Sequence, residues 1–239
     1  MTRRRMNQGN LTTVGFDADD TLWHNERFFQ DTQAQFAELL ADHAEPDHLS
    51  RRLLAAEKRN LGQYGYGIKG FTLSMIETAI EVTDQRVPAS VIAKLMQAGR
   101  DMLTHPIELL PHAAEAVQSV AQTHRIILIT KGDLLDQERK LAQSGLGDLF
   151  DRVEIVSEKT ASGYARIFAH HGDGVDRGLM VGNSMRSDVV PMINAGGWGV
   201  HIPHGVEWKI EHAEPPLESP RYRDLNDLSG LARLVGEIG

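Results

Sequence analysis

The spacing of apolar residues changes character twice along the chain. Residues 11–17 form a short apolar run that predicts a buried strand. From Glu26 onward the apolar residues recur at helical spacing, in two segments before and two segments after the stretch GQYGYGIKG at residues 62–70. Residues 23–104 are therefore expected to form an all-helical block without a strand.

From Pro106 onward, helical segments alternate with four short runs rich in Val, Ile and Leu. Short aliphatic runs separated by helices are typical of a parallel sheet that is covered on both faces. The predicted fold class is therefore α/β: a Rossmann-like parallel sheet with helices on both faces, interrupted after its first strand by an inserted all-helical domain. Residues 211–224 are polar and rich in proline, which predicts a loop before a last helix. The four aliphatic runs are RIILIT at 125–130, DRVEIVS at 151–157, RGLMVG at 177–182 and WGVHIP at 198–203.

These patterns divide the chain into three parts. Residues 1–10 are expected to be a disordered leader, in which Met6 is an alternative start of the protein. Residues 11–22 and 105–239 are expected to form the α/β core, and residues 23–104 the inserted helical block.

Charge and composition exclude several classes of function. The chain has 25 Lys and Arg residues against 33 Asp and Glu residues, a formal charge of −8, which argues against nonspecific binding to nucleic acid or to an anionic membrane. It contains no cysteine, which excludes disulfides, thiolate metal sites and a cysteine nucleophile. No apolar stretch approaches the ~18 residues of a membrane-spanning helix. We therefore expect a cytoplasmic protein, a monomer or homodimer, that binds neither membrane nor nucleic acid polymer.

Polar side chains gather where the predicted strands end. The first strand is followed by Asp17 and Asp19, and further polar residues follow three later strands. Ligands bind beyond the carboxyl ends of an open parallel sheet, so these residues should converge in one pocket if the strands are neighbours. Clustered carboxylates with other oxygen donors, and without Cys or His beside them, suit a hard divalent ion such as Mg²⁺. The residues at the later strands are Thr130, Lys131, Lys159, Asn183, Ser184 and Asp188.

In this order, the strand-end residues resemble the four motifs of the haloacid dehalogenase-like hydrolases. FDADDT at 16–21 is similar to the first motif, and GNSMRSD at 182–188 is similar to the fourth. Thr130 stands at the position of the second motif and Lys159 at that of the third. The resemblance covers residues 12–204, and it implies that the helical block is the small cap that this family inserts between its first and second motifs.

The resemblance also implies a reaction. The expected function is Mg²⁺-dependent hydrolysis of a small phosphorylated metabolite, of the nucleotide or sugar phosphate class, through a covalent aspartyl-phosphate on Asp17. Asp19 would be the general acid and base, and its backbone carbonyl would join Asp17 and Asp188 in binding the metal. Lys159 would balance the negative charge of the phosphate and of Asp17.

The remaining residues of the motifs would bind the phosphate. Thr130 and the backbone N–H groups of Ala18 and Lys131 are expected to bind its nonbridging oxygens. The chain departs from the common pattern of the family in two places. Asn183 stands where Asp is frequent, which suggests an outer or water-mediated contact to the metal. Thr160 follows the third-motif lysine where Pro is usual, which affects only the start of the next helix.

Three other functions stay open at this point. A phosphotransferase or mutase would use the same residues. A C–halogen or C–P hydrolase of the same fold is disfavoured by Asp19, because those relatives lack the acid and base at that position. A non-catalytic binding protein is disfavoured by the complete set of motif residues.

The sequence does not identify the substrate. In the stretch GQYGYGIKG, Tyr64, Tyr66 and Lys69 would contact the leaving group if this part of the cap faces the pocket. A loop that only packs within the cap or faces solvent explains the same composition equally well.

Overall fold

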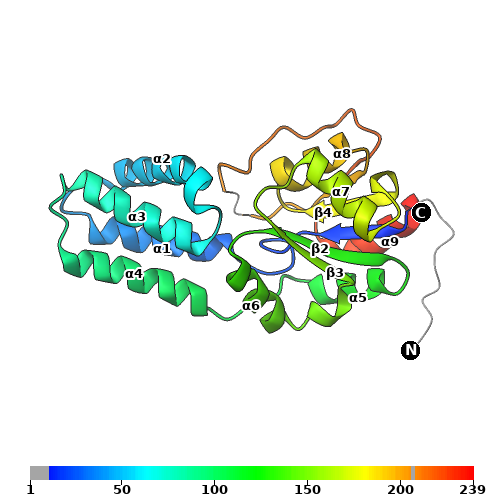
Figure 1. Ribbon diagram of the computed structural model, residues 1–239, viewed down its shortest axis with the longest axis horizontal. Helices are drawn as coiled ribbons and strands as arrows, with labels where there is room; N and C mark the ends of the chain where they lie inside the picture. Colours follow the sequence, from blue (N-terminus) through cyan, green and yellow to red (C-terminus); the bar gives the residue numbers. More distant parts are fainter. Residues whose placement is uncertain (1–10, 206–207) are drawn as a thin grey trace. The chain divides into compact units, whose positions relative to one another are not determined.

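The computed structural model describes residues 11–205 and 208–239. Within these residues, six strands form one parallel sheet in the order β3-β2-β1-β4-β5-β6 (Figure 1). This confirms the predicted α/β class. The predicted leader at 1–10, with Met6, lies outside the described residues. The strands are β1 (Thr13–Phe16), β2 (Arg125–Lys131), β3 (Arg152–Val156), β4 (Gly178–Gly182), β5 (Trp198–His201) and β6 (Tyr222–Asp224).

The first strand lies in the middle of the sheet. Gly15 on β1 is opposite Ile127 on β2 and opposite Met180 on β4. A side chain at Gly15 would force its neighbours to shift, because a Cβ atom there would lie 2.9 Å from the sulfur of Met180 and 3.1 Å from the ring of Phe168. The acidic residues that follow β1 therefore emerge between the ends of β2 and β4.

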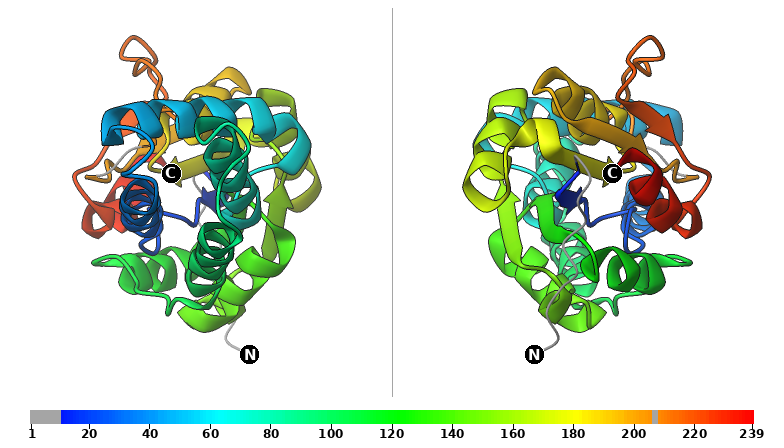
Figure 2. Two further views of the ribbon diagram at one scale, coloured as in Figure 1. Left: turned by 90° about the vertical axis from the view of Figure 1, so that its left-hand side faces the viewer. Right: turned by 90° about the vertical axis from the view of Figure 1, so that its right-hand side faces the viewer.

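Helices cover both faces of this sheet (Figure 2). On one face, Val14 and Phe16 of β1 pack with the apolar side chains of α5 and α9. On the other face, Ile127 and Met180 pack with those of α7 and α8. The helices of this part of the chain are α5 (Ala113–Ala121), α6 (Leu134–Ser144), α7 (Ala161–His171), α8 (Val190–Asn194) and α9 (Leu231–Ile238).

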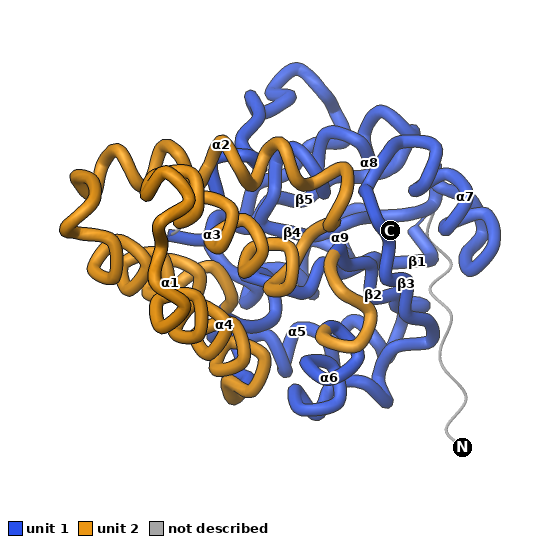
Figure 3. The backbone as a smooth tube through the Cα atoms, turned by 60° about the vertical axis from the view of Figure 1, so that its left-hand side comes forward, with its two compact units in different colours: residues 1–24, 107–131, 137–239 blue, residues 25–106, 132–136 orange. Residues whose placement is uncertain are grey.

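The contacts between residues divide the chain into two compact units (Figure 3). The first unit contains the sheet and consists of residues up to 24, 107–131 and 137–239. The second unit consists of residues 25–106 and the short segment 132–136. Its helices lie between β1 and β2 in the sequence, which confirms the predicted helical insertion. They are α1 (Glu26–Leu39), α2 (Pro46–Tyr64), α3 (Ile68–Val82) and α4 (Ala89–Thr104).

The inserted helices have an apolar core of their own. Phe36 of α1, Leu53 of α2, Phe71 and Met75 of α3 and Leu95 of α4 are all buried in it. These residues recur at helical spacing in the sequence, which is why the block could be predicted as helical. None of the helices in residues 11–205 and 208–239 is long and apolar enough to span a bilayer.

The loop between α2 and α3 is shorter than predicted. Helix α2 continues to Tyr64 and α3 starts at Ile68, so Lys69 lies in a helix and only residues 65–67 form the loop. Gly70, one of the glycines that suggested a longer loop, serves close packing in α3: a Cβ atom there would lie 2.8 Å from the backbone carbonyl oxygen of Gly65. Gly65 itself has φ 73°, in the left-handed region that glycine tolerates.

The sixth strand was not predicted. Residues 222–224 pair with β5 as a parallel edge strand, inside the stretch that was expected to be a loop. Three residues are too few for apolar and polar positions to alternate visibly. The strand is held instead by backbone pairing and by Arg223, whose guanidinium lies 4.8 Å from the centre of the Trp198 ring.

Candidate active site

A tight turn after β1 presents the acidic residues. The carbonyl of Ala18 accepts the backbone N–H of Leu22 at 2.8 Å, which closes the turn directly after Asp17. Within it, Asp20 has φ 59°, in the left-handed region where Asp is tolerated better than most residues. The turn leaves the carboxylates of Asp17 and Asp19 beyond the carboxyl end of the central strand.

Lys159 joins two of the predicted site residues. Its Nζ donates to Oδ1 of Asp17 and, at 2.6 Å, to Oδ1 of Asp188. All three side chains are almost completely buried. The other oxygen of Asp17 accepts a hydrogen bond from the hydroxyl of Thr21 at 3.0 Å. Residues that follow β1, β3 and β4 thus meet in one buried group, as the strand-end argument predicted.

The charges in this group are not balanced. Burial and the nearby carboxylate of Asp188 raise the pKa of Asp17 to about 7, and Lys159 offsets only part of this rise. Burial opposes the charge of Lys159, but the carboxylates of Asp17 and Asp188 outweigh it and raise the pKa of the lysine. Two carboxylates share one ammonium, so the group favours either a proton or a further cation.

Asp188 is held in place by its own loop. It lies in the π-helical turn Met185–Val189, a geometry often found at functional sites. The hydroxyl of Ser184 caps this turn by accepting the N–H of Ser187 at 2.9 Å, and the N–H of Ser184 donates to Oδ2 of Asp188 at 3.0 Å. Only glycine fits at position 182, because a Cβ atom there would lie 2.2 Å from the same carboxylate oxygen.

The carboxylate of Asp19 has a separate set of partners. It accepts hydrogen bonds from Trp23 Nε1 at 2.7 Å, from Lys140 Nζ at 3.0 Å and from Gln137 Nε2 at 2.9 Å. Gln137 Nε2 also lies 3.0 Å from the hydroxyl of Thr130, so it links the second-motif residue to Asp19. Sequence reasoning missed Gln137 and Lys140, because polar residues on α6 read as a solvent-facing helix side.

Lys131 and Glu211 form a third group. Lys131 Nζ donates to Oε1 of Glu211 at 2.7 Å and to the hydroxyl of Ser187 at 2.7 Å. Glu211 belongs to the stretch predicted as a polar loop, and nothing in its sequence surroundings marked it. The predicted role of the Lys131 backbone N–H in binding phosphate stays a prediction.

Comparison with known proteins identifies the family. A family model described as haloacid dehalogenase-like hydrolase matches residues 11–196. The chain belongs to the haloacid dehalogenase-like hydrolases. This confirms the predicted family. A solved hydrolase of the same family from Xanthomonas campestris is 42% identical, with a TM-score of 0.87 over 100% of this chain and 96% of that chain.

More distant solved structures share the fold of this hydrolase. YfnB from Bacillus subtilis, a HAD-hydrolase crystallised bound to magnesium, is 16% identical, with a TM-score of 0.64 over 94% of this chain and 98% of that chain. An L-2-haloacid dehalogenase from Xanthobacter autotrophicus, with chloropropionic acid covalently bound, is 18% identical, with a TM-score of 0.64 over 96% of this chain and 100% of that chain. Among curated protein sequences, none matches the chain.

The donor set of this hydrolase suits Mg²⁺. Among residues 11–205 and 208–239, no three His, Asp or Glu side chains converge as a metal cluster. Mg²⁺ does not need such a cluster, because it usually binds one or two carboxylates and keeps several waters. Asp17 and Asp188 are two buried carboxylates with one ammonium between them, so they offer two oxygen ligands and one negative charge that the ammonium leaves uncompensated. The side chain of Asp19 is engaged elsewhere, which leaves its backbone carbonyl as the predicted ligand.

Asn183 contacts the turn that carries the acidic residues. Its backbone N–H donates to Thr21 Oγ1 at 3.0 Å, and the same hydroxyl donates to Asp17. Its backbone carbonyl accepts from His201 Nε2 at 3.1 Å. Asn183 therefore reaches Asp17 through one intervening hydroxyl, a position that agrees with an outer contact.

Thr160 explains the second departure from the family pattern. Helix α7 begins at Ala161, and the hydroxyl of Thr160 accepts the N–H of Gly163 at 3.1 Å. A capping threonine therefore starts the helix where the family usually has proline.

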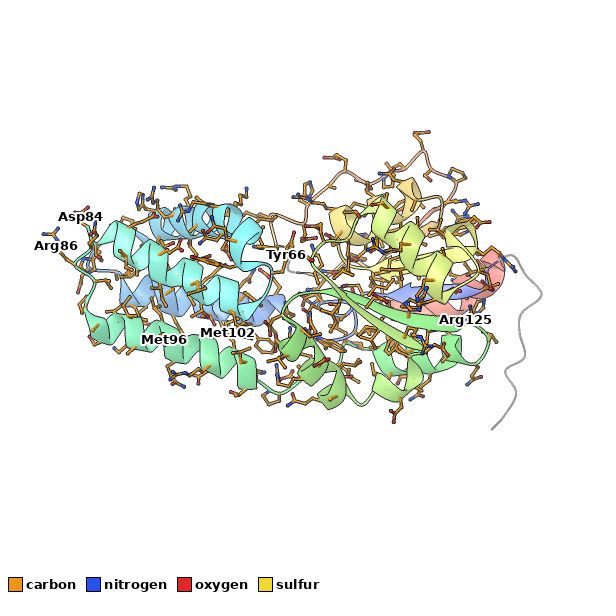
Figure 4. The ribbon with its side chains drawn as sticks, in the orientation of Figure 1. Tyr66, Asp84, Arg86, Met96, Met102 and Arg125 are labelled. Atoms are coloured by element: carbon orange, nitrogen blue, oxygen red, sulfur yellow. The ribbon has the colours of Figure 1, made fainter. Side chains whose placement is uncertain are left out.

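The predicted cap residues lie in the second unit. Tyr66 is in the loop between α2 and α3 (Figure 4). Lys69 Nζ donates to both carboxylate oxygens of Asp133 at 2.9 Å, and Asp133 belongs to the same unit. A contact of Tyr66 or Lys69 with a leaving group stays a prediction.

Proposed function

We propose that this hydrolase is a Mg²⁺-dependent phosphatase that acts on a small phosphorylated metabolite of the nucleotide or sugar phosphate class. One observation carries the proposal. A buried lysine, Lys159, binds both Asp17 and Asp188, while a further carboxylate, Asp19, stands two residues from Asp17 with separate partners. A nucleophile and an acid and base are thus available as distinct groups.

In the first half of the reaction, Asp17 attacks the phosphorus atom. A carboxylate oxygen of Asp17 forms a bond to phosphorus, and the bond between phosphorus and the ester oxygen breaks. Asp19 donates its proton to the leaving alkoxide. To do so, Asp19 must enter the step as the protonated acid, and its carboxyl group must exchange the hydrogen bonds from Lys140 and Gln137 for one to the substrate. Lys159 balances charge on the transferred group.

In the second half, water cleaves the aspartyl-phosphate. Asp19, now a carboxylate, takes a proton from the water as its oxygen attacks phosphorus. Phosphate leaves, and Asp17 returns to its starting state. Thr130 and the backbone N–H groups of Ala18 and Lys131 bind the nonbridging oxygens in both halves.

Asp17, Asp188 and the backbone carbonyl of Asp19 would hold the metal. When bound, Mg²⁺ supplies positive charge that neutralises the phosphoryl oxygens and the clustered carboxylates. Lys159 contributes a second positive charge from the protein itself, and Asn183 supports Asp17 through Thr21.

The presence of Asp19 favours an ester over a carbon–halogen bond as substrate. An alkoxide leaving group needs a proton as the bond breaks, whereas a halide leaves as a stable anion and needs none. A dehalogenase would not need Asp19 as a proton donor, although here Trp23, Gln137 and Lys140 hold the Asp19 carboxylate in place.

The direct test is a panel of phosphorylated metabolites assayed for released phosphate. We expect turnover of one chemical class with Mg²⁺ and none in excess chelator. The panel should include 2-haloacids, with halide release as the readout. Full activity in chelator, or halide release without phosphate release, would contradict the proposal.

Two variants separate the proposed roles. Asp17→Asn should abolish turnover and prevent a covalent phosphoryl group from forming. Asp19→Asn should still form the aspartyl-phosphate from substrates with good leaving groups, but break it down about 10²–10⁴-fold more slowly. Intact-protein mass spectrometry should then detect the added phosphoryl group in the Asp19 variant only. Turnover near the parent rate without Asp17 would refute the covalent route.

A further inference from the structure

A short segment of the core packs on the turn that carries Asp188. The backbone N–H of Arg186 donates to the carbonyl of Glu211 at 3.3 Å, and Arg186 Nη1 donates to the carbonyl of Ile210 at 2.7 Å. The side chain of Ile210 is buried. These contacts hold the segment on the turn through its backbone, whatever side chain stands at position 211.

The carboxylate of Glu211 binds three side chains from two loops. Its Oε1 accepts from Lys131 Nζ at 2.7 Å, at the end of β2. Its Oε2 accepts from the hydroxyl of Ser184 at 2.5 Å and from that of Ser187, both in the loop after β4. One carboxylate therefore connects the end of the second-motif strand to the loop of the fourth motif.

These contacts keep Glu211 charged in a largely buried place. Its side chain is 14% exposed, and that of Lys131 is 11% exposed. Burial by itself raises the pKa of Glu211, but the charge of Lys131 and the three hydrogen bonds prevail and hold the pKa below its ordinary value. Hydrogen bonds to a charged group are stronger than those between neutral groups, so Glu211 holds Lys131, Ser184 and Ser187 strongly.

The connection leads directly to Asp188. Glu211 binds the hydroxyl of Ser184, and the backbone N–H of Ser184 binds Oδ2 of Asp188. A residue that fixes Ser184 therefore also fixes the direction of that carboxylate. Groups that orient metal ligands in this way affect metal affinity strongly, although they do not touch the ion.

We propose that Glu211 is a positioning residue: by binding Lys131, Ser184 and Ser187 together, it orients Asp188 and sets the affinity of the site for Mg²⁺. This inference rests on the proposed function, since it assumes that Asp188 is a metal ligand. It adds a residue outside the four motifs, from a segment far along the chain.

The test measures Mg²⁺ binding by calorimetry, which does not depend on a substrate. Glu211→Gln keeps the size of the side chain and the backbone contacts of the segment but removes the charge. Glu211→Ala removes the whole carboxylate. We expect both variants to bind Mg²⁺ about 10–100-fold more weakly than the parent, and Ser184→Ala to lose affinity in the same direction. Excess Mg²⁺ should restore much of the kcat of Glu211→Gln.

The matched control lies in the same segment. Glu214 is also a glutamate, but its side chain is 94% exposed, so Glu214→Ala should bind Mg²⁺ like the parent. If Glu211 only stabilised the fold, its variants would unfold at lower temperature yet bind Mg²⁺ normally while folded. Parent-like affinity in Glu211→Ala, measured well below its unfolding temperature, would therefore overturn the proposal.

A double variant tests whether Lys131 acts together with Glu211 in setting the affinity for Mg²⁺. Lys131→Met should also weaken Mg²⁺ binding, and adding Glu211→Gln should cause little further loss because both changes break the same connection. Fully additive losses would overturn a joint role of the two residues. If the parent protein neither binds Mg²⁺ nor releases phosphate, the proposed function and this inference are both wrong. If the parent is active and the Glu211 variants bind Mg²⁺ as tightly as the parent, only the inference is wrong.

Discussion

Replacing Lys159 by methionine removes the ammonium that binds both Asp17 and Asp188. Methionine has a similar length and fills the space without a charge. The two carboxylates, 9% and 1% exposed, are left facing each other with their lysine partner gone. Lys159→Met therefore separates the electrostatic role of the lysine from its packing.

The size of the effect follows from the burial of the pair. Removing one partner of a buried ion pair costs about 3–5 kcal/mol, because the remaining charge is buried without compensation. In a protein of this length each kcal/mol lowers the melting temperature by about 2–4 °C, so we expect a decrease of roughly 6–20 °C in the presence of chelator. Lys69→Met is the control, because the side chain of Lys69 is 52% exposed and its pair with Asp133 should contribute only about 0–1 kcal/mol.

The loss of stability in Lys159→Met should depend on pH and on Mg²⁺. The folded-state pKa of Asp17, about 7, lies above its ordinary value of 3.8, so between these values the folded protein keeps a proton that the unfolded chain releases. The metal-free parent should therefore lose stability as pH rises through this window. Without Lys159 the pKa of Asp17 rises further, so the deficit of the variant should be smaller near about pH 5 than near about pH 8. Mg²⁺ should reduce the deficit by restoring positive charge.

Thermal unfolding followed by circular dichroism measures all of these effects. The parent, Lys159→Met and Lys69→Met should be compared in chelator and in Mg²⁺ at both pH values. A decrease for Lys159→Met no larger than that of the control at the higher pH would show that the buried group does not depend on the lysine. If Lys159→Met melts below the parent by the same amount at both pH values, the loss of stability does not come from the uncompensated charge of Asp17 and Asp188.

Three further variants test other features of the structure. Gly182→Ala places a Cβ atom 2.2 Å from Oδ2 of Asp188, so it should lower stability by about 1–3 kcal/mol and weaken Mg²⁺ binding in a calorimetric titration; parent-like binding would contradict the packing argument. Lys140→Met removes a charged partner of Asp19 and should cost about 1.5–3 kcal/mol in urea unfolding, more than the exposed Lys69→Met. Glu57 is buried in α2, and burial raises its pKa to about 7, so the stability of the parent should fall as pH rises from about 4.5 to about 7. Glu57→Gln should therefore be more stable than the parent near about pH 8. No gain in stability there would show that Glu57 carries no unfavourable buried charge.

The strand-end residues could be predicted because their signal is local. Aliphatic runs mark the strands, parallel strands place their carboxyl ends at one edge, and the residue after each run is read directly from the sequence. The structure brings Asp17, Lys159 and Asp188 together on this basis, although Asp17 and Lys159 are 142 positions apart.

The partners of these residues could not be predicted, because only the tertiary structure brings them together. Gln137 and Lys140 are polar residues on a helix and Glu211 is a glutamate in a Pro-rich stretch, so each reads as solvent-exposed. Their pairing with Asp19 and Lys131 joins positions 80 to 121 residues apart and depends on how helix α6 and the 208–212 segment pack. Gly62 and Gly70 were likewise interpreted as loop residues, although helices α2 and α3 contain them.

The central position of β1 has a consequence for synthesis of the chain on the ribosome. This strand is made first, but its neighbours β2 and β4 follow only after the inserted helices and much of the core. At about 5–20 residues per second, both edges of β1 stay unpaired for roughly 6–20 s until β2 is complete, and the edge that pairs with β4 stays open for roughly 10–30 s. The helices α1–α4 draw their apolar core from residues within the insertion, so they can bury it during this time. The newly made Asp17 therefore stays without its lysine until residue 159 has been made, and the buried group of carboxylates and ammonium forms only after β4 and the turn that carries Asp188.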